Sequence, residues 1–287
     1  MRIADILYRI IPNQWFACLS KQYYKLLKKW HTQINENQFQ ELLETKLEIK
    51  KGDTVAVHSS VNKLNINFSV YNLLNILLEV VGDEGTLLFP NWHYTGRAEH
   101  YLKNPNSVFN VNNSPSMLGI LSELARRHPK AYRSCHPTAA VCAIGKHAEV
   151  LLDSHHLDIY PCGKESPWYK MLKYNPKIVG IGEKVVSLSF IHCVEEVCYD
   201  QFPVKTLSDD LAEARVVLEN GEEIIVKTRY GNGKVRKKDF VKFFKQHVSK
   251  QSCKMFQFKS MNFFTCNPAL LFEEMLQLAN KGITLYK

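Results

Sequence analysis

The chain has 287 residues, of which 45% are hydrophobic and 23% are charged. This composition is typical of a globular protein and excludes disorder over most of the length. Thirty-seven Lys and Arg against 28 Asp and Glu give a net charge of +9. The long-range field therefore favours anionic ligands, such as phosphates and nucleotides, over polycationic ones.

Eight scattered cysteines include no C-x-x-C pair, so zinc-finger spacing is absent and no metal is expected. In a chain of this length such cysteines are most simply reduced thiols, which indicates the cytoplasm. No apolar run reaches the roughly 20 residues that span a bilayer. The N-terminus also lacks the pattern of a secretory signal. We therefore expect a cytoplasmic protein.

Residues 1–40 differ in pattern from the rest of the chain. Apolar side chains at helical spacing, with lysines around them, predict a basic amphipathic helix over residues 1–30. Such a helix can lie on an anionic membrane surface, here the inner membrane, or pack on its own domain or on a second copy in a homo-oligomer. Packing is the commoner outcome. The predicted organisation is a helical extension over residues 1–40 and one domain over residues 41–287.

From residue 51 onward, strands and helices alternate. The predicted strands cover residues 54–60, 85–90, 140–145 and 177–182. A predicted helix covers residues 70–81 and ends at Gly82. Ser114 and Pro115 form a helix-start pattern, N-cap then first position, and predict a helix that continues to about Arg127. This alternation is typical of an α/β sheet covered by helices.

The last third of the chain departs from the alternation. Residues 216–226 read VVLENGEEIIV, two β-rich runs around an Asn-Gly pair, which is the strongest short hairpin signal. Residues 234–250 predict a basic helix with an aromatic inner face, and an Asn-Pro pair at residue 267 begins a last helix. The predicted fold class is α/β, a mixed central sheet flanked by helices with an antiparallel hairpin appendage.

Polar clusters fall where α/β sheets bind ligands, at the carboxyl ends of strands and the N-termini of helices. They lie at residues 58–60, 114–116 and 133–138. Ser and His at such positions are more often caps and turn formers than ligands. The candidate ligand contacts are His58, Ser59, Ser60, Ser116, Gly119, Ser134 and His136.

Ser189, His192 and Glu195 are spaced by three residues, so in a helix they share one face. A carboxylate beside an imidazole fixes the ring tautomer and raises its basicity, as a general base requires. The alternative is a surface His–Glu pair of little consequence. A metal site with Glu196 and Cys198 would need a second cluster, and the sequence offers none that is obvious.

The sequence lacks the motifs of several enzyme classes. No G-x-G-x-x-G follows a strand, and neither a G-x-x-x-x-G-K-[ST] nor a G-x-S-x-G occurs. Dinucleotide oxidoreductases, P-loop enzymes and ordinary α/β-hydrolases are therefore disfavoured. Nucleic-acid binding also lacks a recognisable motif, and lysine-rich helices are usually solvated faces.

Ordered segments over residues 40–280 resemble the aminoglycoside 3-N-acetyltransferase family. They are KGDTVAVHSSVNKL, VVGDEGTLLFPNW, SPSMLGILSELARRHPKAYRSCHPT, YPCGKESPWYKML, KIVGIG and LSFIHCVEE. The resemblance implies a CoA-dependent N-acyltransferase that moves an acyl group, most simply from acetyl-CoA, to a sugar amine. It implies that His192 and Glu195 are catalytic, and Ser189 is added as an oxyanion donor. It also implies that CoA lies near residues 58–60 and 116, to which we add Gly119, Ser134 and His136 from the same clusters.

Two departures from the family pattern concern the acceptor. Leu118 stands where the family often has Met, and Ala139 and Ala140 follow the His-Pro-Thr where it often has His and Ser. The predicted acceptor contacts are Asn91, His93, Arg97 and Tyr160. Residues 91–101 contain a single acid, Glu99, whereas a polycationic aminoglycoside needs clustered carboxylates. We therefore expect a nucleotide-linked amino sugar of surface glycan biosynthesis as acceptor, with an aminoglycoside, and hence antibiotic resistance, as the alternative.

Overall fold

The computed structural model describes residues 22 and 31–286. Its helices are α3 (Glu36–Thr45), α4 (Val70–Val81), α5 (Ala98–Leu102), α6 (Ile120–Arg126), α7 (Ala148–Leu152), α8 (Pro167–Lys170), α9 (Ile191–Val197), α10 (Phe240–His247) and α11 (Pro268–Asn280). Its strands are β1 (Thr54–Ser59), β2 (Thr86–Pro90), β3 (Val108–Asn110), β4 (Ala131–Arg133), β5 (Val141–Gly145), β6 (Pro176–Ile181), β7 (Ala212–Val217), β8 (Glu223–Thr228), β9 (Cys253–Phe258) and β10 (Met261–Cys266). The four predicted strands and the helix at residues 70–81 are confirmed within a residue or two.

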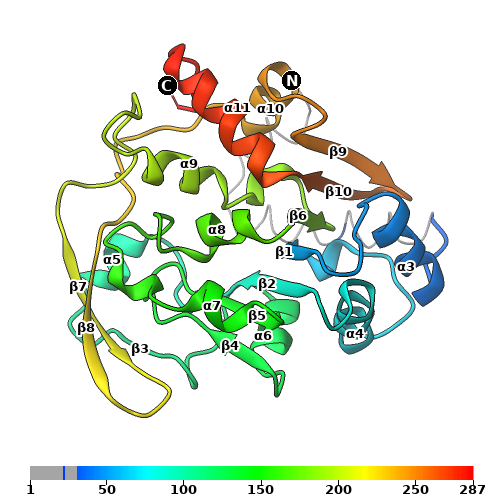
Figure 1. The fold of residues 1–287 in the computed structure, drawn as a ribbon, viewed down its shortest axis with the longest axis horizontal. Coiled ribbons are helices and arrows are strands. Elements are labelled where there is room, and N and C mark those ends of the chain that lie inside the picture. The colour runs from blue at the N-terminus through cyan, green and yellow to red at the C-terminus, as the bar shows by residue number, and fades with distance from the viewer. Residues whose placement is uncertain (1–21, 23–30, 287) are drawn as a thin grey trace.

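Seven strands form the central sheet, in the order β4-β5-β2-β1-β6-β10-β9 (Figure 1). Strand β1 pairs in parallel with β2 and β6, and the other pairs are antiparallel. The sheet is therefore mixed, and the predicted fold class is confirmed. Because β1, β2 and β6 run in the same direction, their carboxyl ends meet at one edge of the sheet.

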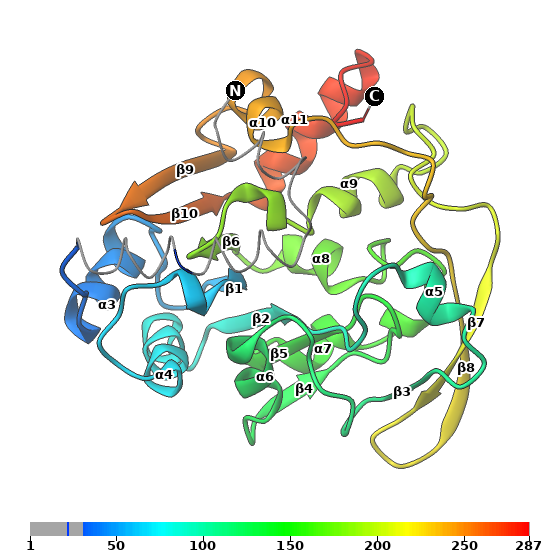
Figure 2. The ribbon, with the colours of Figure 1, turned by 180° about the vertical axis from the view of Figure 1, so that it is seen from behind.

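Both faces of the sheet are covered by helices, as Figures 1 and 2 show. Successive side chains of a strand point to opposite faces. Val55 and Val57 of β1 therefore join a core with α3, α4 and α6, while Ala56 joins a second core with α7, α8, α9 and α11. Burial on both faces explains why β2 reads as a continuous apolar run with all five residues buried.

The predicted hairpin is confirmed as an appendage outside the central sheet. Strands β7 and β8 pair antiparallel on either side of the Asn220-Gly221 turn, and β3 joins them in parallel as a three-stranded sheet. Gly221 has a φ of 88°, a conformation that glycine adopts without steric cost. In Figure 2 this small sheet lies on the opposite side of the molecule from β9 and β10.

The helix predicted to start at Ser114 begins later, so this prediction is wrong. Its first residue is Ile120 and its N-cap is Gly119, with a φ of 99°. The backbone N–H of Ser116 donates instead to the carboxylate of Glu123, a side chain of α6 itself, at 2.8 Å. Side-chain bonding of this kind competes with helix formation and keeps the preceding segment a loop.

The basic helix predicted over residues 234–250 is shorter than expected. Asp239 caps it, because its side chain accepts from the Lys242 N–H at 2.9 Å, and α10 begins at the next residue. The segment before it is extended enough for Lys237 to pair with Tyr286 in an antiparallel bridge. The aromatic inner face is confirmed by the burial of Phe240, Phe243 and Phe244.

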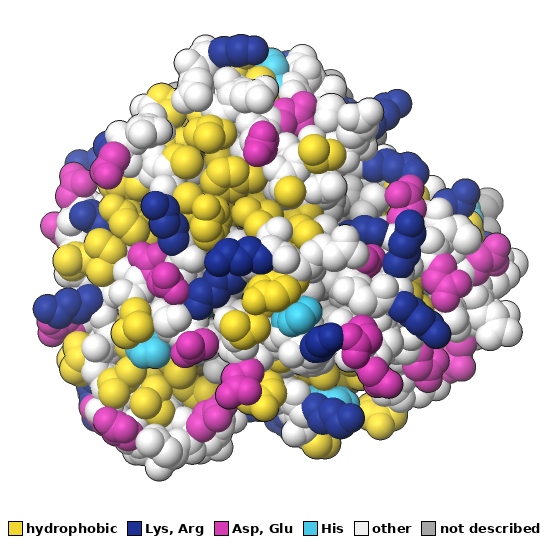
Figure 3. Space-filling model, viewed as in Figure 1, with side chains coloured by type: hydrophobic (Ala, Val, Ile, Leu, Met, Phe, Trp, Pro, Cys, Tyr) yellow, Lys and Arg dark blue, Asp and Glu magenta, His cyan; other side chains and the backbone are white. Residues whose placement is uncertain are grey.

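The amphipathic helix predicted over residues 1–30 lies outside the described residues, apart from residue 22. The predicted domain boundary at residue 40 falls inside α3, whose Phe39, Leu42 and Leu43 are buried in the core with α4. The division into residues 1–40 and 41–287 therefore stays a prediction. Within residues 31–286, no helix is both long and apolar enough to cross a membrane. On the face in Figure 3, positive and negative side chains are interspersed rather than gathered in one patch.

Candidate active site

A cleft of about 360 Å³ opens where the parallel strands β1 and β2 end, next to the loop that follows β6. Its lining residues are Val57, His58, Ser59, Pro90, Trp92, Leu118, Ser122, Glu183, Val186, Ser187, Leu188, Ser189, Ile191, His192 and Lys237. The carboxyl ends of parallel strands are the usual ligand position in α/β sheets. The cleft also brings together four of the predicted site residues, namely His58, Ser59, Ser189 and His192.

The imidazole of His192 is held by Glu195, one turn further along α9. The Nδ1 atom of His192 lies 2.8 Å from Oε2 of Glu195. The glutamate side chain is only 1% exposed, whereas that of His192 is 35% exposed. When Nδ1–H donates to the carboxylate, the lone pair of Nε2 is free to take a proton. This arrangement suits a general base at the surface of the cleft.

Ser189 lines the cleft but does not share a helix face with His192, so this part of the prediction is wrong. It precedes the N-cap residue Phe190, and its carbonyl accepts from the His192 N–H at 3.0 Å. The chain therefore turns at Ser189 before α9 begins. Its hydroxyl remains a candidate donor within the cleft.

Tyr286 supports the His192–Glu195 pair, which is called the dyad below. The sequence did not indicate this tyrosine as a site residue. Its hydroxyl donates to Oε1 of Glu195 at 2.5 Å. Desolvation, and the negative charge of Glu195, raise the pKa of Tyr286, so the phenol stays protonated and remains a donor. The contact joins residues 91 positions apart in the sequence, and no local pattern predicts such a pair.

Lys237 is the second residue that the sequence did not indicate. Its Nζ lies 3.4 Å from Nε2 of His192, on the side of the imidazole away from Glu195. Desolvation of the ammonium lowers the pKa of Lys237 below its ordinary value. The segment 234–238 looks like part of a solvated basic helix, so its sequence gives no sign of a side chain inside a cleft.

His58 is buried at the end of β1, where its ring stacks on Trp168 at a centroid distance of 5.9 Å. Burial lowers the pKa of His58 to about 4, so the ring is neutral at pH 7. Its Nε2 has no hydrogen-bond partner among the described residues. A buried polar atom without a partner beside a cleft suits a ligand that supplies the missing bond. Ser59 also lines the cleft, whereas Ser60 is not a lining residue and stands at the N-cap position of a short 3₁₀ helix without a side-chain capping bond.

Ser134 and His136 lie outside the cleft lining, in a buried polar cluster with bonds of its own. Oγ of Ser134 accepts from the Val141 N–H at 3.0 Å and lies 2.9 Å from Nδ1 of His155. Nδ1 of His136 accepts from the Thr138 N–H at 3.3 Å. These bonds give both side chains a structural role. Their predicted contact with CoA stays a prediction without geometric support.

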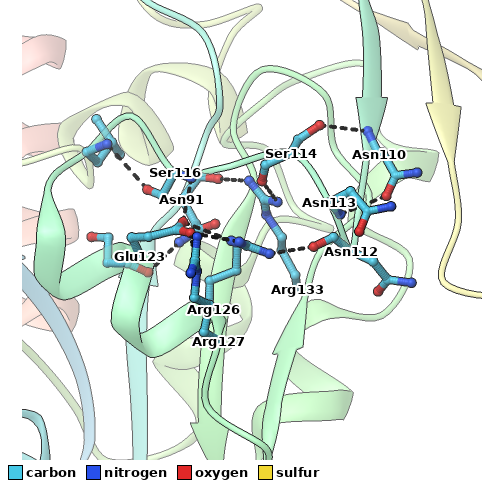
Figure 4. Close-up of polar contacts among 12 residues, drawn as sticks. Asn91, Asn110, Asn112, Asn113, Ser114, Ser116, Glu123, Arg126, Arg127 and Arg133 are labelled. Carbon is cyan, nitrogen blue, oxygen red and sulfur yellow. Dashed lines mark hydrogen bonds and ion pairs between the residues drawn. The ribbon is translucent and has the colours of Figure 1, made fainter. Parts of the chain in front are cut away.

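Arg133 joins segments behind one wall of the cleft, and Figure 4 shows its contacts with Asn91 and Ser114. Its guanidinium is buried and donates to the carbonyls of Asn91 at 2.6 Å, Val111 at 3.1 Å and Ser114 at 2.5 Å. The side chain of Asn91, a predicted acceptor contact, donates to the carbonyl of Ser122 at 2.9 Å. Asn91 therefore holds the lining residue Ser122 in place rather than lining the cleft itself.

Ser116 and Gly119, both predicted ligand contacts, shape the same wall. Besides the Ser116 N–H, the Glu123 carboxylate accepts from Arg126 at 2.7 Å and from Arg127 at 2.6 Å (Figure 4). These bonds, that from Arg126 above all, lower the pKa of Glu123 to about 2. Of the loop before α6, the lining residue is Leu118. Ser116 and Gly119 thus position that loop, and their contact with CoA stays a prediction.

Replacing Arg133 by methionine should lower the free energy of unfolding by about 2 kcal/mol. Three carbonyls lose their donor, although methionine also removes the desolvation cost that lowers the pKa of Arg133 to about 10. Urea denaturation measures the change. Arg127→Met is the matched control, because Arg127 is 68% exposed in its ion pair with Glu123 and should cost less than about 1 kcal/mol. Equal losses in the two variants would contradict this view of the wall.

Three other predicted acceptor contacts lie away from the cleft lining. His93 packs among aromatic rings, and burial lowers its pKa to about 4. Arg97 forms an ion pair with Glu99 at 3.2 Å, and Tyr160 packs on another tyrosine ring. Trp92, from the same segment, does line the cleft. The roles of His93, Arg97 and Tyr160 in acceptor binding stay predictions.

Glu196, the residue after Glu195, has a structural role. Its buried carboxyl accepts from the Cys162 N–H at 2.6 Å. Burial raises the pKa of Glu196 well above its usual range, which favours the protonated carboxyl. Among residues 31–286, no three His, Cys, Asp or Glu side chains gather as metal ligands.

The chain is similar to proteins named as aminoglycoside N-acetyltransferases or as like them. The chain is 28% identical over 165 residues to the SPbeta prophage-derived aminoglycoside N(3')-acetyltransferase-like protein YokD of Bacillus subtilis, a match over 52% of this chain and 60% of that protein. It is 30% identical over 169 residues to aminoglycoside N(3)-acetyltransferase VII of Streptomyces paromomycinus, over 53% of this chain and 57% of that protein. The matches thus span less than two thirds of these relatives' length.

Solved structures share the fold over nearly the whole chain. Aminoglycoside acetyltransferase AAC(3)-Xa superposes with a TM-score of 0.76 and 19% identity, over 93% of this chain and 99% of that one. The binary complex of AAC-IIIb with CoASH gives a TM-score of 0.74 and 18% identity, over 88% and 98% of the two chains. The sequence model of the aminoglycoside 3-N-acetyltransferases matches residues 56–279, well over half of the chain. The chain therefore belongs to the aminoglycoside 3-N-acetyltransferase family.

Proposed function

We propose that this protein is an acetyl-CoA-dependent N-acetyltransferase that acetylates the amine of an amino sugar. The observation that carries the proposal is the His192–Glu195 pair in the cleft at the strand ends, in a chain of this family. A structural neighbour that binds CoASH supports the choice of donor. The Nε2 of neutral His58, which has no partner in the part of the chain that the structure describes, and the hydroxyl of Ser59 fit the polar arm of CoA.

Bound acetyl-CoA supplies the thioester carbonyl, and the residues of the chain handle the proton and the developing charge. His192 takes a proton from the acceptor nitrogen on Nε2 as the new C–N bond forms. Glu195 keeps the proton of Nδ1 in place and stabilises the imidazolium. The hydroxyl of Ser189, or a backbone N–H, donates to the oxyanion. The C–S bond then breaks, and the proton leaves with the CoA thiol.

The names of the relatives specify aminoglycosides, so these are the first acceptors to assay. The nucleotide-linked amino sugar that the sequence favours has no support in the comparisons, which agree better with the alternative. A role in surface glycan biosynthesis has none either. Membrane contact through residues 1–30, association of copies and a cytoplasmic location stay predictions.

The test measures thiol release from acetyl-CoA with a panel of aminoglycosides and a panel of nucleotide-linked amino sugars. We expect release that depends on the acceptor, together with a product that is heavier by one acetyl group. Release with one panel alone identifies the acceptor class. If neither panel gives release and calorimetry detects no binding of CoA, the proposal is wrong.

A further inference from the structure

The charged side chains near His192 differ in whether an opposite charge pairs with them. Among the residues that line the cleft, Glu183 pairs with Lys63 at 3.0 Å. Lys237 makes no ion pair with any described residue within 4.0 Å, and its Nζ lies 3.4 Å from Nε2 of His192. Among the described residues, the carboxylate that contacts the His192 imidazole is that of Glu195, which is buried. The accessible charge beside the base is therefore a positive one.

Backbone pairing with the C-terminal segment fixes the position of Lys237. Lys237 forms an antiparallel bridge with Tyr286. The N–H of Lys238 donates to the Leu285 carbonyl at 2.8 Å, and its Nζ donates to the Thr284 carbonyl at 2.9 Å. The same pairing brings the Tyr286 hydroxyl onto Glu195. Adjacent lysines thus have different surroundings, one in the cleft and one tied to the C-terminal segment.

We propose that Lys237 selects an acceptor that carries a phosphate or carboxylate group close to its reacting amine. The inference rests on the proposed acetyl transfer and narrows its acceptor. The amine must reach Nε2 of His192, where the Lys237 ammonium now lies. A polycationic acceptor meets a like charge there, whereas an anion beside the amine pairs with Nζ and draws it away from Nε2.

The cost of the unpaired ammonium supports this role. Lys237 lines the cleft although the residue is solvent-exposed, and partial desolvation lowers the pKa of its ammonium. An anionic partner within the cleft would offset part of that cost. Lysine suits the task because its ammonium sits on a flexible stem with rotatable donors. It can release Nε2 and follow the anion without moving the backbone pairing.

The experiment compares kcat/KM of the full chain for four acceptors. They are an aminoglycoside, a hexosamine phosphate, a hexosamine linked to a nucleoside diphosphate, and an amino sugar acid with a carboxylate. The wild-type protein should favour the anionic acceptors, and the arms separate phosphate, nucleotide and carboxylate as the source of the anion. Lys237→Glu should reverse the preference, lowering the ratio of anionic to polycationic kcat/KM on the order of tenfold or more.

Lys238→Glu is the matched control, because it changes the net charge equally while its Nζ is bonded to Thr284. It should leave the ratio within about twofold of the wild-type value, since surface charges act weakly at a distance. Lys237→Gln is a second variant in case Lys237→Glu does not fold. It should lower the ratio less than Lys237→Glu, because it removes the positive charge without adding a negative one.

Three results would overturn the inference. One is an unchanged ratio in Lys237→Glu, and another is an equal change in Lys238→Glu. The third is a rise confined to the KM for acetyl-CoA, which would place Lys237 on the donor. Turnover without any charge preference rejects this inference alone, whereas no turnover with any of the four acceptors, together with no binding of CoA in calorimetry, rejects the proposed function.

Discussion

Replacing His192 by alanine should lower kcat on the order of 10²- to 10⁴-fold, the usual contribution of a general base. The imidazole is the group whose Nε2 can accept the amine proton while Nδ1 stays bonded to a carboxylate at 2.8 Å. Binding of acetyl-CoA should persist, because the donor contacts assigned to His58 and Ser59 are unchanged. Thiol-release kinetics give kcat, and calorimetry with CoA gives the affinity.

The matched control is His100→Ala, which removes an exposed imidazole at the end of α5. Its kcat should equal that of the wild-type protein. A His192→Ala variant that turns over at the wild-type rate would refute the assignment of the base. A variant that loses CoA binding as well would instead place His192 in the donor site.

The predictions that succeeded depend on short-range patterns. The helix over residues 70–81 ends at Gly82 as expected, because the apolar spacing and the terminal glycine are both local signals. The hairpin followed from its Asn-Gly pair, and α11 begins at Pro268 after the Asn267 cap. His192 and Glu195 are one helical turn apart, so their contact could also be inferred from spacing.

The features that the sequence did not predict depend on side-chain and backbone contacts that leave no repeating pattern in the sequence. Ser114 begins no helix because Glu123 binds the backbone of the loop that follows it. Ser134 and His136 have hydrogen bonds within a buried cluster, and their contact with CoA stays a prediction. Lys237 and Tyr286 reach the dyad only because their segments pair with each other. Residue periodicity and spacing do not indicate such pairing, so the sequence did not predict the contacts of Lys237 and Tyr286 with the dyad.

Replacing Glu195 by glutamine should lower kcat on the order of 10²-fold or more, with little change in the KM for the acceptor. The amide has the same shape, but it is uncharged and can present an N–H to Nδ1, which then acts as acceptor and leaves the proton on Nε2. Glu196→Gln is the matched control. Burial favours the protonated form of that carboxyl, and its oxygen accepts from the Cys162 N–H, which an amide oxygen can also do. The kcat of this variant should therefore stay within a few-fold of wild type.

Tyr286→Phe tests whether the phenol positions the same carboxylate. Removing the 2.5 Å bond to Oε1 leaves Glu195 free to rotate away from Nδ1, so kcat should fall on the order of tenfold at unchanged KM. In the Glu195→Gln background the same change should cost less than about twofold, because the carboxylate on which it acts is already gone. A double-mutant cycle of kcat values measures this coupling. Equal costs in both backgrounds would show that Tyr286 acts on the fold of the C-terminal segment and not through the dyad.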